Sequence, residues 1–312
     1  MKSKLMTVLF MTVLGLVAAP LALEQLNNLK GSAERWARNA FLSGVTVHAS
    51  APRASASDEQ PQSLAITSTT LQSSSDEFRW SGRVAQGNSV EIKGINGNVR
   101  AEPSAGGEVE VTAVKTGRHS DPKEVEIRVL QHANGVTICA VYPSSDPGRP
   151  NGCEAGSNWS SHTHNNDVSV DFTVRVPQGV RFIGKTVNGN VETGALTSDV
   201  DASSVNGSIR VSAAGVASAR TVNGSITASL GRANWTGPLR FETVNGGITL
   251  DLPSDTSADV RAETVNGDIN TDFPMTIQGR ISRRHLDGTI GSGGRELSLK
   301  TVNGSITLRR TS

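Results

Sequence analysis

One hexapeptide recurs along this chain and constrains its possible folds more than any other feature. It reads TVNGSI at 221–226 and again at 301–306. The other copies are GINGNV at 94–99, TVNGNV at 186–191, SVNGSI at 204–209, TVNGGI at 243–248, TVNGDI at 264–269 and the degenerate HLDGTI at 285–290. From residue 184 onward the motif returns at intervals of 16 to 22 residues, which is typical of a repeat architecture.

Apolar and polar residues alternate on both sides of each Asn-Gly pair. Before Asn266, for example, Val260 and Ala262 alternate with Arg261 and Glu263. This period of two predicts two strands per repeat, each with one buried face. Asn and Gly both tolerate positive φ, so we expect the pair to turn the chain sharply between the two strands.

Two all-β architectures fit this pattern. In a stack of amphipathic β-hairpins, Asn-Gly would close each turn and would oppose Arg240 to Asp251, which is favourable, but Lys93 to Arg100, which is not. In a β-solenoid built from repeats of about 20 residues, Asn-Gly would form a corner, and equivalent residues would stack about 4.8 Å apart. We favour the solenoid, because stacking explains the repetition and because 4% aromatic residues suit a narrow core.

In a solenoid, the corner Asn side chains can form a ladder of hydrogen bonds from coil to coil. We expect Asn245 to lie between Asn223 and Asn266, and Asp287 to interrupt the ladder before Asn303, since a carboxylate has no amide donor. A second column would contain Thr186, Ser204, Thr221, Thr243, Thr264 and Thr301. The predicted turn ladder consists of Asn96, Asn188, Asn206, Asn223, Asn245, Asn266, Asp287 and Asn303.

These motifs resemble those of a known group of bacterial families. KGINGNV at 93–99, followed by repeated TVNGxI units, is similar to the putative-adhesin families of β-strand-repeat proteins. One of them is the auto-transporter adhesin head, or GIN domain, whose Gly-Ile-Asn corresponds here to Gly94, Ile95 and Asn96. The resemblance covers roughly 80–312. It implies a right-handed β-solenoid outside the cytoplasm and no assigned catalytic residues.

Composition divides the chain into four segments. Two lysines precede an uncharged run from Leu5 to Leu23, which predicts a signal peptide or, if it stays uncleaved, a membrane anchor. We expect the body to be exported, either to the periplasm or to the cell surface. The segments are a signal peptide at 1–22, a low-complexity linker with a short amphipathic helix at 23–77, an N-terminal β region with a disulfide loop at 78–183, and the repeat solenoid, continuous with it, at 184–312.

The two cysteines of the chain, Cys139 and Cys153, enclose a short loop rich in Pro, Gly and Ser. A metal site or a redox pair more often has closer or more numerous cysteines. In an exported protein, the pair therefore predicts a structural disulfide that closes this loop.

Few residues suggest chemistry. The formal net charge of +1 gives no reason to expect a nucleic-acid partner. His162 and His164 with Asp167 could be drawn as a metal site, but two His and one carboxylate in a polar loop are a weak signal, and we predict neither a metal nor a cofactor. The acids around Asp251 and Asp259 fall on polar positions of the alternation or in turns, so we predict no catalytic residues.

The sequence therefore predicts an exported, non-enzymatic β-solenoid that acts as an adhesin or as a binding or structural protein of the cell envelope. Its partner would be an unknown envelope or extracellular protein or polysaccharide, with membrane contact only through an uncleaved N-terminal segment. Two alternatives stay open, a polysaccharide-processing β-helix enzyme and an envelope sensory or regulatory component that binds another membrane protein. The enzyme is disfavoured because four Trp and one Tyr are dispersed along the chain, whereas sugar subsites gather aromatic rings.

Overall fold

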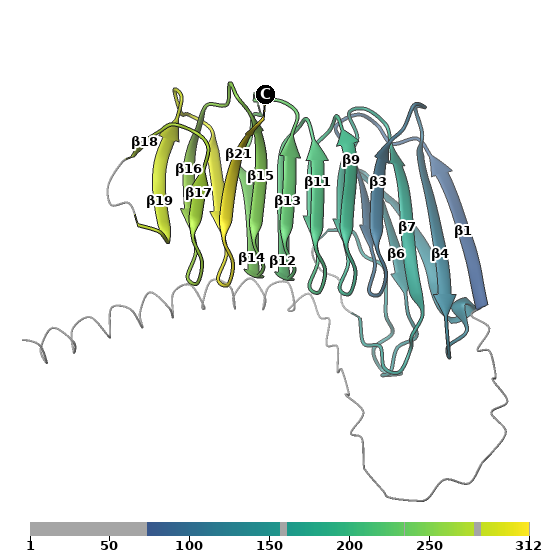
Figure 1. Ribbon diagram of the computed structural model, residues 1–312. Helices are drawn as coiled ribbons and strands as arrows, with labels where there is room; N and C mark the ends of the chain where they lie inside the picture. Colours follow the sequence, from purple (N-terminus) through teal and green to yellow (C-terminus); the bar gives the residue numbers. More distant parts are fainter. Residues whose placement is uncertain (1–73, 157–160, 234, 278–281, 312) are drawn as a thin grey trace, which may run out of the picture.

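The structure is a computed structural model that describes residues 74–156, 161–233, 235–277 and 282–311 (Figure 1). These residues form 21 β-strands and one 3-10 turn at Pro122–Glu124. The predicted signal peptide or anchor and nearly all of the predicted linker lie outside the described residues. Within the described ranges, no helix has the length and apolar character needed to cross a membrane.

The strands form two long sheets that lie face to face. In spatial order, the ten-stranded sheet contains β1 (Ser74–Gly82), β4 (Val109–Gly117), β7 (Ser169–Val176), β3 (Val99–Pro103), β9 (Val191–Leu196), β11 (Ile209–Ala213), β13 (Ile226–Leu230), β15 (Ile248–Pro253), β21 (Ile306–Thr311) and β17 (Ile269–Thr271). The eleven-stranded sheet contains β18 (Met275–Ile277), β19 (His285–Ile290), β16 (Ala258–Glu263), β20 (Glu296–Lys300), β14 (Leu239–Asn245), β12 (Ala217–Asn223), β10 (Val200–Ser203), β8 (Arg181–Lys185), β2 (Ser89–Lys93), β6 (Gly135–Val141) and β5 (Glu126–His132).

Each repeat contributes one strand to each sheet. β14 ends at Asn245 and β15 begins at Ile248, yet β14 pairs in parallel with β12 and β20, while β15 pairs in parallel with β13 and β21. The two strands that flank an Asn-Gly corner are therefore not hydrogen-bonded to each other. The β-solenoid prediction is confirmed, and the alternative of stacked β-hairpins is wrong.

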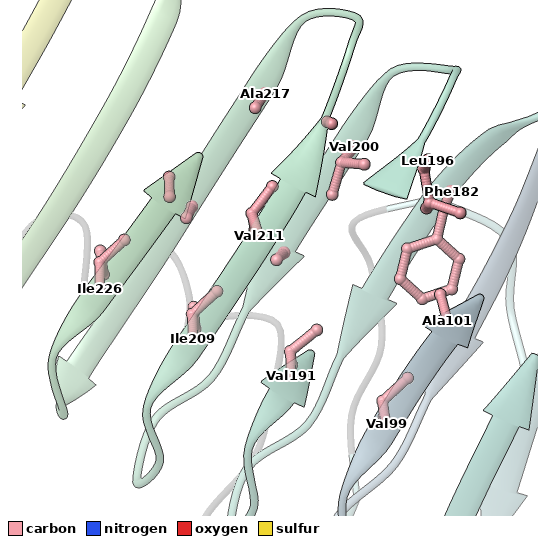
Figure 2. Packing of buried hydrophobic residues seen from close by; sticks show 14 of the residues in the cluster. Val99, Ala101, Phe182, Val191, Leu196, Val200, Ile209, Val211, Ala217 and Ile226 are labelled. Carbon is pink, nitrogen blue, oxygen red and sulfur yellow. The ribbon is translucent and has the colours of Figure 1, made fainter. Parts of the chain in front are cut away.

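A narrow aliphatic core fills the space between the sheets. The last residue of the hexapeptide starts a strand of the ten-stranded sheet in every copy except HLDGTI, and Val99, Val191, Ile209 and Ile226 point inward and form one buried column (Figure 2). The alternation read from the sequence is what places these residues on one face of each strand. Phe182, also buried, is one of the few large rings in this core.

The coils do not stack in chain order. The last coil, β20–β21, lies between β14–β15 and β16–β17, although it follows both in the chain. At the other end, the first coil, β2–β3, lies between β6–β7 and β8–β9. Both terminal repeats are thus inserted into the stack rather than added to its ends.

Antiparallel strands close both ends of this parallel stack. β4 and β1 extend the ten-stranded sheet beyond β7, and β5 extends the other sheet beyond β6. At the opposite end, β19 pairs antiparallel with β16, and β18 with β19. The degenerate hexapeptide HLDGTI is the whole of β19, so it forms part of this cap and is not a coil corner.

Candidate functional site

The corner asparagines form one continuous ladder along the stack. Six Nδ2 groups each donate to the Oδ1 of the neighbouring Asn on the side of Asn96, with N···O distances from 2.7 to 2.9 Å, so all six hydrogen bonds point in the same direction. In spatial order the ladder is Asn96, Asn188, Asn206, Asn223, Asn245, Asn303 and Asn266. Asn245 therefore lies between Asn223 and Asn303, and the expectation that it neighbours Asn266 is wrong.

Asp287 has no place in this ladder. It lies opposite Arg261 in the antiparallel pair of β19 and β16, and its Oδ2 lies 3.0 Å from Nε2 of His285. Asn266 donates directly to Asn303 at 2.8 Å, which leaves no gap between them. The prediction that Asp287 interrupts the ladder is wrong, because the last coil inserts beside the coil that carries Asn266.

The corner Asn is explained by hydrogen bonding and not by its tolerance of positive φ. Among the described residues, Asn165 is the one non-glycine residue with positive φ, so the predicted positive φ of the corner asparagines is wrong. The following Gly is required by a close approach between coils. A Cβ on Gly207 would stand 1.9 Å from the carbonyl oxygen of Gly189, and one on Gly224 would stand 2.1 Å from that of Gly207.

Two further columns of hydrogen bonds flank the Asn ladder. At every ladder Asn except Asn96, the hydroxyl two residues before it donates to the Gly carbonyl of the adjacent corner, as in Thr221 Oγ1 to Gly207 O at 2.8 Å. The expected Thr column thus exists as bonds to the backbone. The side chain after the corner Gly accepts from the backbone of the adjacent coil at five corners, as in Ser208 N–H to Asn190 Oδ1 at 2.8 Å, and this column was not predicted.

The residues that follow the disulfide loop cover part of the outer face of the eleven-stranded sheet. A disulfide joins Cys139 of β6 to Cys153. The Nζ of Lys93 in β2 donates to the carbonyls of Glu154 and Gly156, the latter at 2.7 Å. We call residues 153–156 the cover, because beneath them Glu91 and Lys93 are only 3% and 0% exposed.

A buried ionic cluster lies beneath the cover. Lys185 Nζ donates to Glu91 Oε1 at 2.7 Å, and Thr137 Oγ1 donates to Glu91 Oε2 at 2.9 Å. Burial opposes the charge of Glu91, but the hydrogen bond and charge of Lys185, with the charge of Lys93, hold the pKa of Glu91 below its usual value. Burial lowers the pKa of Lys93 by more than the charge of Glu91 raises it.

A hollow of about 410 Å³ opens beside this cluster. Glu91, His132, Lys185 and Asp201 are among the residues that line it. Because Thr137 donates its hydroxyl proton to Glu91, its oxygen accepts from His132 Nε2, 3.1 Å away, which assigns the proton of the ring to Nε2. The charged groups that face this hollow are thus of both signs, and Glu91 and Lys185 are paired with each other.

A second hollow, of about 420 Å³, lies farther along the same outer face. Three arginines from three strands line it: Arg181 of β8, Arg220 of β12 and Arg240 of β14. Asp199, Ser218 and the turn at 236–238 complete most of the lining. We call it the arginine hollow. Sequence reasoning missed it, because each arginine reads separately as a solvated outward residue and only the coil register brings the three together.

The acids considered for catalysis do not converge. Asp251 belongs to β15 of the ten-stranded sheet, whereas Asp259 belongs to β16 of the eleven-stranded sheet. Asp255 is exposed in the turn between them. Asp259 accepts from Thr289 Oγ1 and from the backbone of Gly294. Their geometry is that of surface and turn residues.

The histidine motif is likewise tied into its loop. Asp167 accepts from the backbone of Ser120 and from Nδ1 of His119, and these hydrogen bonds hold the pKa of Asp167 well below its usual range. His162 is held through its backbone, which donates to Asn151 Oδ1. In the part of the chain that the structure describes, no group of three or more His, Cys, Asp or Glu could hold a metal ion.

The fold and its corners define a solenoid of Asn-Gly repeats, and comparison with known proteins agrees with this. Residues 185–309 match the model of the Toastrack DUF4097 family. The matched residues make up less than half of the chain. Over these residues the expected resemblance to adhesin-like β-repeat families is confirmed. No curated protein matches the chain significantly.

Several solved structures are similar to the chain at low identity. A putative cell adhesion protein from Clostridium sporogenes ATCC 15579 is 10% identical, with a TM-score of 0.45, over 76% of this chain and 100% of that one. A putative adhesin from Bacteroides fragilis NCTC 9343 is 12% identical, with a TM-score of 0.33, over 76% of this chain and 97% of that one.

Proposed function

We propose that this chain is an exported, non-enzymatic, adhesin-like protein that binds an envelope or extracellular partner through the outer face of its eleven-stranded sheet. The observation that carries the proposal is the pair of hollows that open on this one face, on a scaffold held in register by the corner columns. Solenoids expose long regular surfaces of this kind to extended ligands.

Two further observations support export and the absence of catalysis. The Cys139–Cys153 disulfide suits an oxidising compartment outside the cytoplasm. A polysaccharide-cleaving enzyme would need a carboxylate pair at a defined separation in one groove. Asp251 and Asp259 instead lie on different sheets, so the acids singled out from the sequence do not form such a pair.

A steric block on each outer face tests the proposal. Ser203 of β10 points outward between Lys185 and Arg220, hence between the two hollows, whereas Thr227 of β13 points outward from the ten-stranded sheet. The full chain, immobilised, would be incubated with solubilised envelope and culture medium, and captured protein and carbohydrate would be identified. We expect Ser203→Trp to abolish capture of a specific component and Thr227→Trp to leave it unchanged. Equal capture by both variants, or a glycan-cleaving activity of the wild type, would contradict the proposal.

A further inference from the structure

The arginine hollow differs from the other outward-facing charges in how its cations are paired. Arg181, Arg220 and Arg240 each have one carboxylate neighbour, at 3.6, 3.4 and 3.5 Å respectively. These separations exceed the usual length of a charge-assisted hydrogen bond, about 2.7–2.9 Å. Their side chains are 32 to 49% exposed, and loose ion pairs at such exposure contribute little to stability. The three guanidinium forks are therefore available to a ligand.

Arg220 gives the most direct sign of an unmet interaction. Its Nε is shielded from solvent and has no hydrogen-bond partner among the described residues. The nearest carboxylate oxygen, from Glu242, is 3.4 Å away. A buried donor without an acceptor costs free energy. Because this Nε makes no hydrogen bond, the side chain can turn toward an incoming acceptor without breaking one.

The chemistry of the lining selects an oxyanion. A guanidinium presents a planar fork of donors that matches the two oxygens of a carboxylate or of a sulfate. Thr236 can add a hydroxyl donor at the same wall, whereas the hydroxyl of Ser218 already donates to Asp201 Oδ1 at 3.1 Å. No aromatic ring is among the described residues that line this hollow, so stacking on neutral sugar rings is not the mode of recognition that it offers.

The spacing of the arginines selects a polymer over a single small anion. β8, β10, β12 and β14 are consecutive neighbours in the sheet, so Arg181 and Arg240 stand three strand spacings apart, about 14 Å. The nearby carboxylates weaken the attraction of each single arginine for an anion. A chain that carries an oxyanion on successive units can engage all three arginines at once and gain affinity through multivalency.

We infer that the arginine hollow is a binding site for an acidic polysaccharide, whose carboxylate or sulfate groups pair with Arg181, Arg220 and Arg240. This inference rests on the proposed function and names the chemical class of its partner. The ligand lies across β8 to β14 on the outer face, held by charge-assisted hydrogen bonds from the three forks. Its binding weakens with rising ionic strength, as contacts between exposed charges do.

Binding of defined polymers to the full chain, by biolayer interferometry, tests the inference. The probes are polygalacturonate for carboxylates, dextran sulfate for sulfates, dextran as the neutral polymer and poly-L-glutamate as an acidic peptide. The site variant is Arg181→Gln with Arg220→Gln and Arg240→Gln. The control is Arg100→Gln with Arg210→Gln and Arg309→Gln, which removes the same charge from strands of the ten-stranded sheet and touches neither hollow.

We expect the wild type to bind polygalacturonate or dextran sulfate but not dextran, and whichever polymer binds identifies the oxyanion. The site variant should weaken this binding at least about tenfold, and the control should change it less than about twofold. The single variant Arg240→Lys, which keeps the charge but loses the fork, should also bind more weakly. It serves in place of the triple variant if that variant fails to fold by circular dichroism.

Three results would overturn the inference: binding to neither acidic polysaccharide, equal weakening in the site and control variants, or tighter binding of poly-L-glutamate than of both polysaccharides. The proposed function fails separately. If no probe binds but Ser203→Trp still abolishes capture from the envelope, only the acidic-polysaccharide assignment is lost.

Discussion

At the scale of single residues, the Thr, Asn and Gly of the corner motif each make their own contact with the adjacent coil. The Thr hydroxyl donates to a Gly carbonyl, the Asn amide bonds to Asn on both sides, and the Gly admits a carbonyl oxygen where a Cβ would not fit. Each ladder hydrogen bond contributes only modestly to the free energy of unfolding, because the Asn side chains are largely exposed, as at Asn245. An exposed side-chain hydrogen bond contributes no more than about 1 kcal/mol, so the ladder stabilises by repetition.

Asn245→Ala removes one donated and one accepted ladder bond, to Asn223 and from Asn303. We expect a loss of about 1–2 kcal/mol in the free energy of unfolding, at about 1 kcal/mol per bond. Asp287→Asn should stay within about 0.5 kcal/mol of the wild type, as surface changes usually do, because Asp287 lies in the β19 cap. Urea unfolding of both variants provides the measurement. A marked stabilisation by Asp287→Asn would contradict the structure, because it would indicate that residue 287 lies in the ladder between Asn266 and Asn303.

At the scale of elements, β2 and β6 are unusual because the cover buries their outer as well as their inner faces. The sequence predicted the disulfide but not the ions beneath it. Glu91 and Lys93 alternate with Val90 and Ile92, which is the pattern of a solvated face. Nothing local in that pattern indicates that a loop from beyond residue 140 folds back over it. Burial by a distant segment is a tertiary effect that strand periodicity cannot report.

The buried cluster makes part of the stability depend on pH. The folded pKa of Glu91 is lowered, so its contribution is fully present above its unfolded pKa, about 4.3, and is lost as the pH falls through the folded value. Glu91→Gln should cost about 3 kcal/mol at pH 6, because it leaves buried cations without their partner. The gap between wild type and variant should narrow from pH 5 to pH 3 in urea unfolding.

A matched control separates this effect from the general acid sensitivity of the fold. Glu102 is a half-buried glutamate of β3 that lies 3.8 Å from Arg100. Glu102→Gln should change the free energy of unfolding by less than about 0.5 kcal/mol at every pH. A gap between wild type and Glu91→Gln that stays constant down to pH 3 would mean that Glu91 has the same pKa in the folded and the unfolded protein, so that the buried cluster does not lower it.

At the scale of the whole molecule, the solenoid is predictable from the sequence but the order of its coils is not. Alternation and the repeated corner are local signals, and they specify strands, corners and inward residues such as Ile209 and Ile226. The order of stacking depends on which corner lies beside which. Asn303 and Asn266 present the same amide to Asn245, so the hexapeptide itself does not distinguish the two arrangements. The arginine hollow is likewise a product of register, since its three arginines stand on β8, β12 and β14.

Disulfide trapping between outward positions of the ten-stranded sheet tests the inserted last coil most directly. Thr249 of β15 is directly opposite Thr307 of β21, whereas Asn270 of β17 lies beyond β21. Two Cα atoms must be about 4.4–6.8 Å apart to form a disulfide, which suits adjacent strands at about 4.8 Å but not strands two spacings apart. After mild oxidation and peptide mass spectrometry, Thr249→Cys with Thr307→Cys should be cross-linked, and Thr249→Cys with Asn270→Cys should remain reduced. Cross-linking of the second pair without the first would contradict the account, because it would place the coils in chain order.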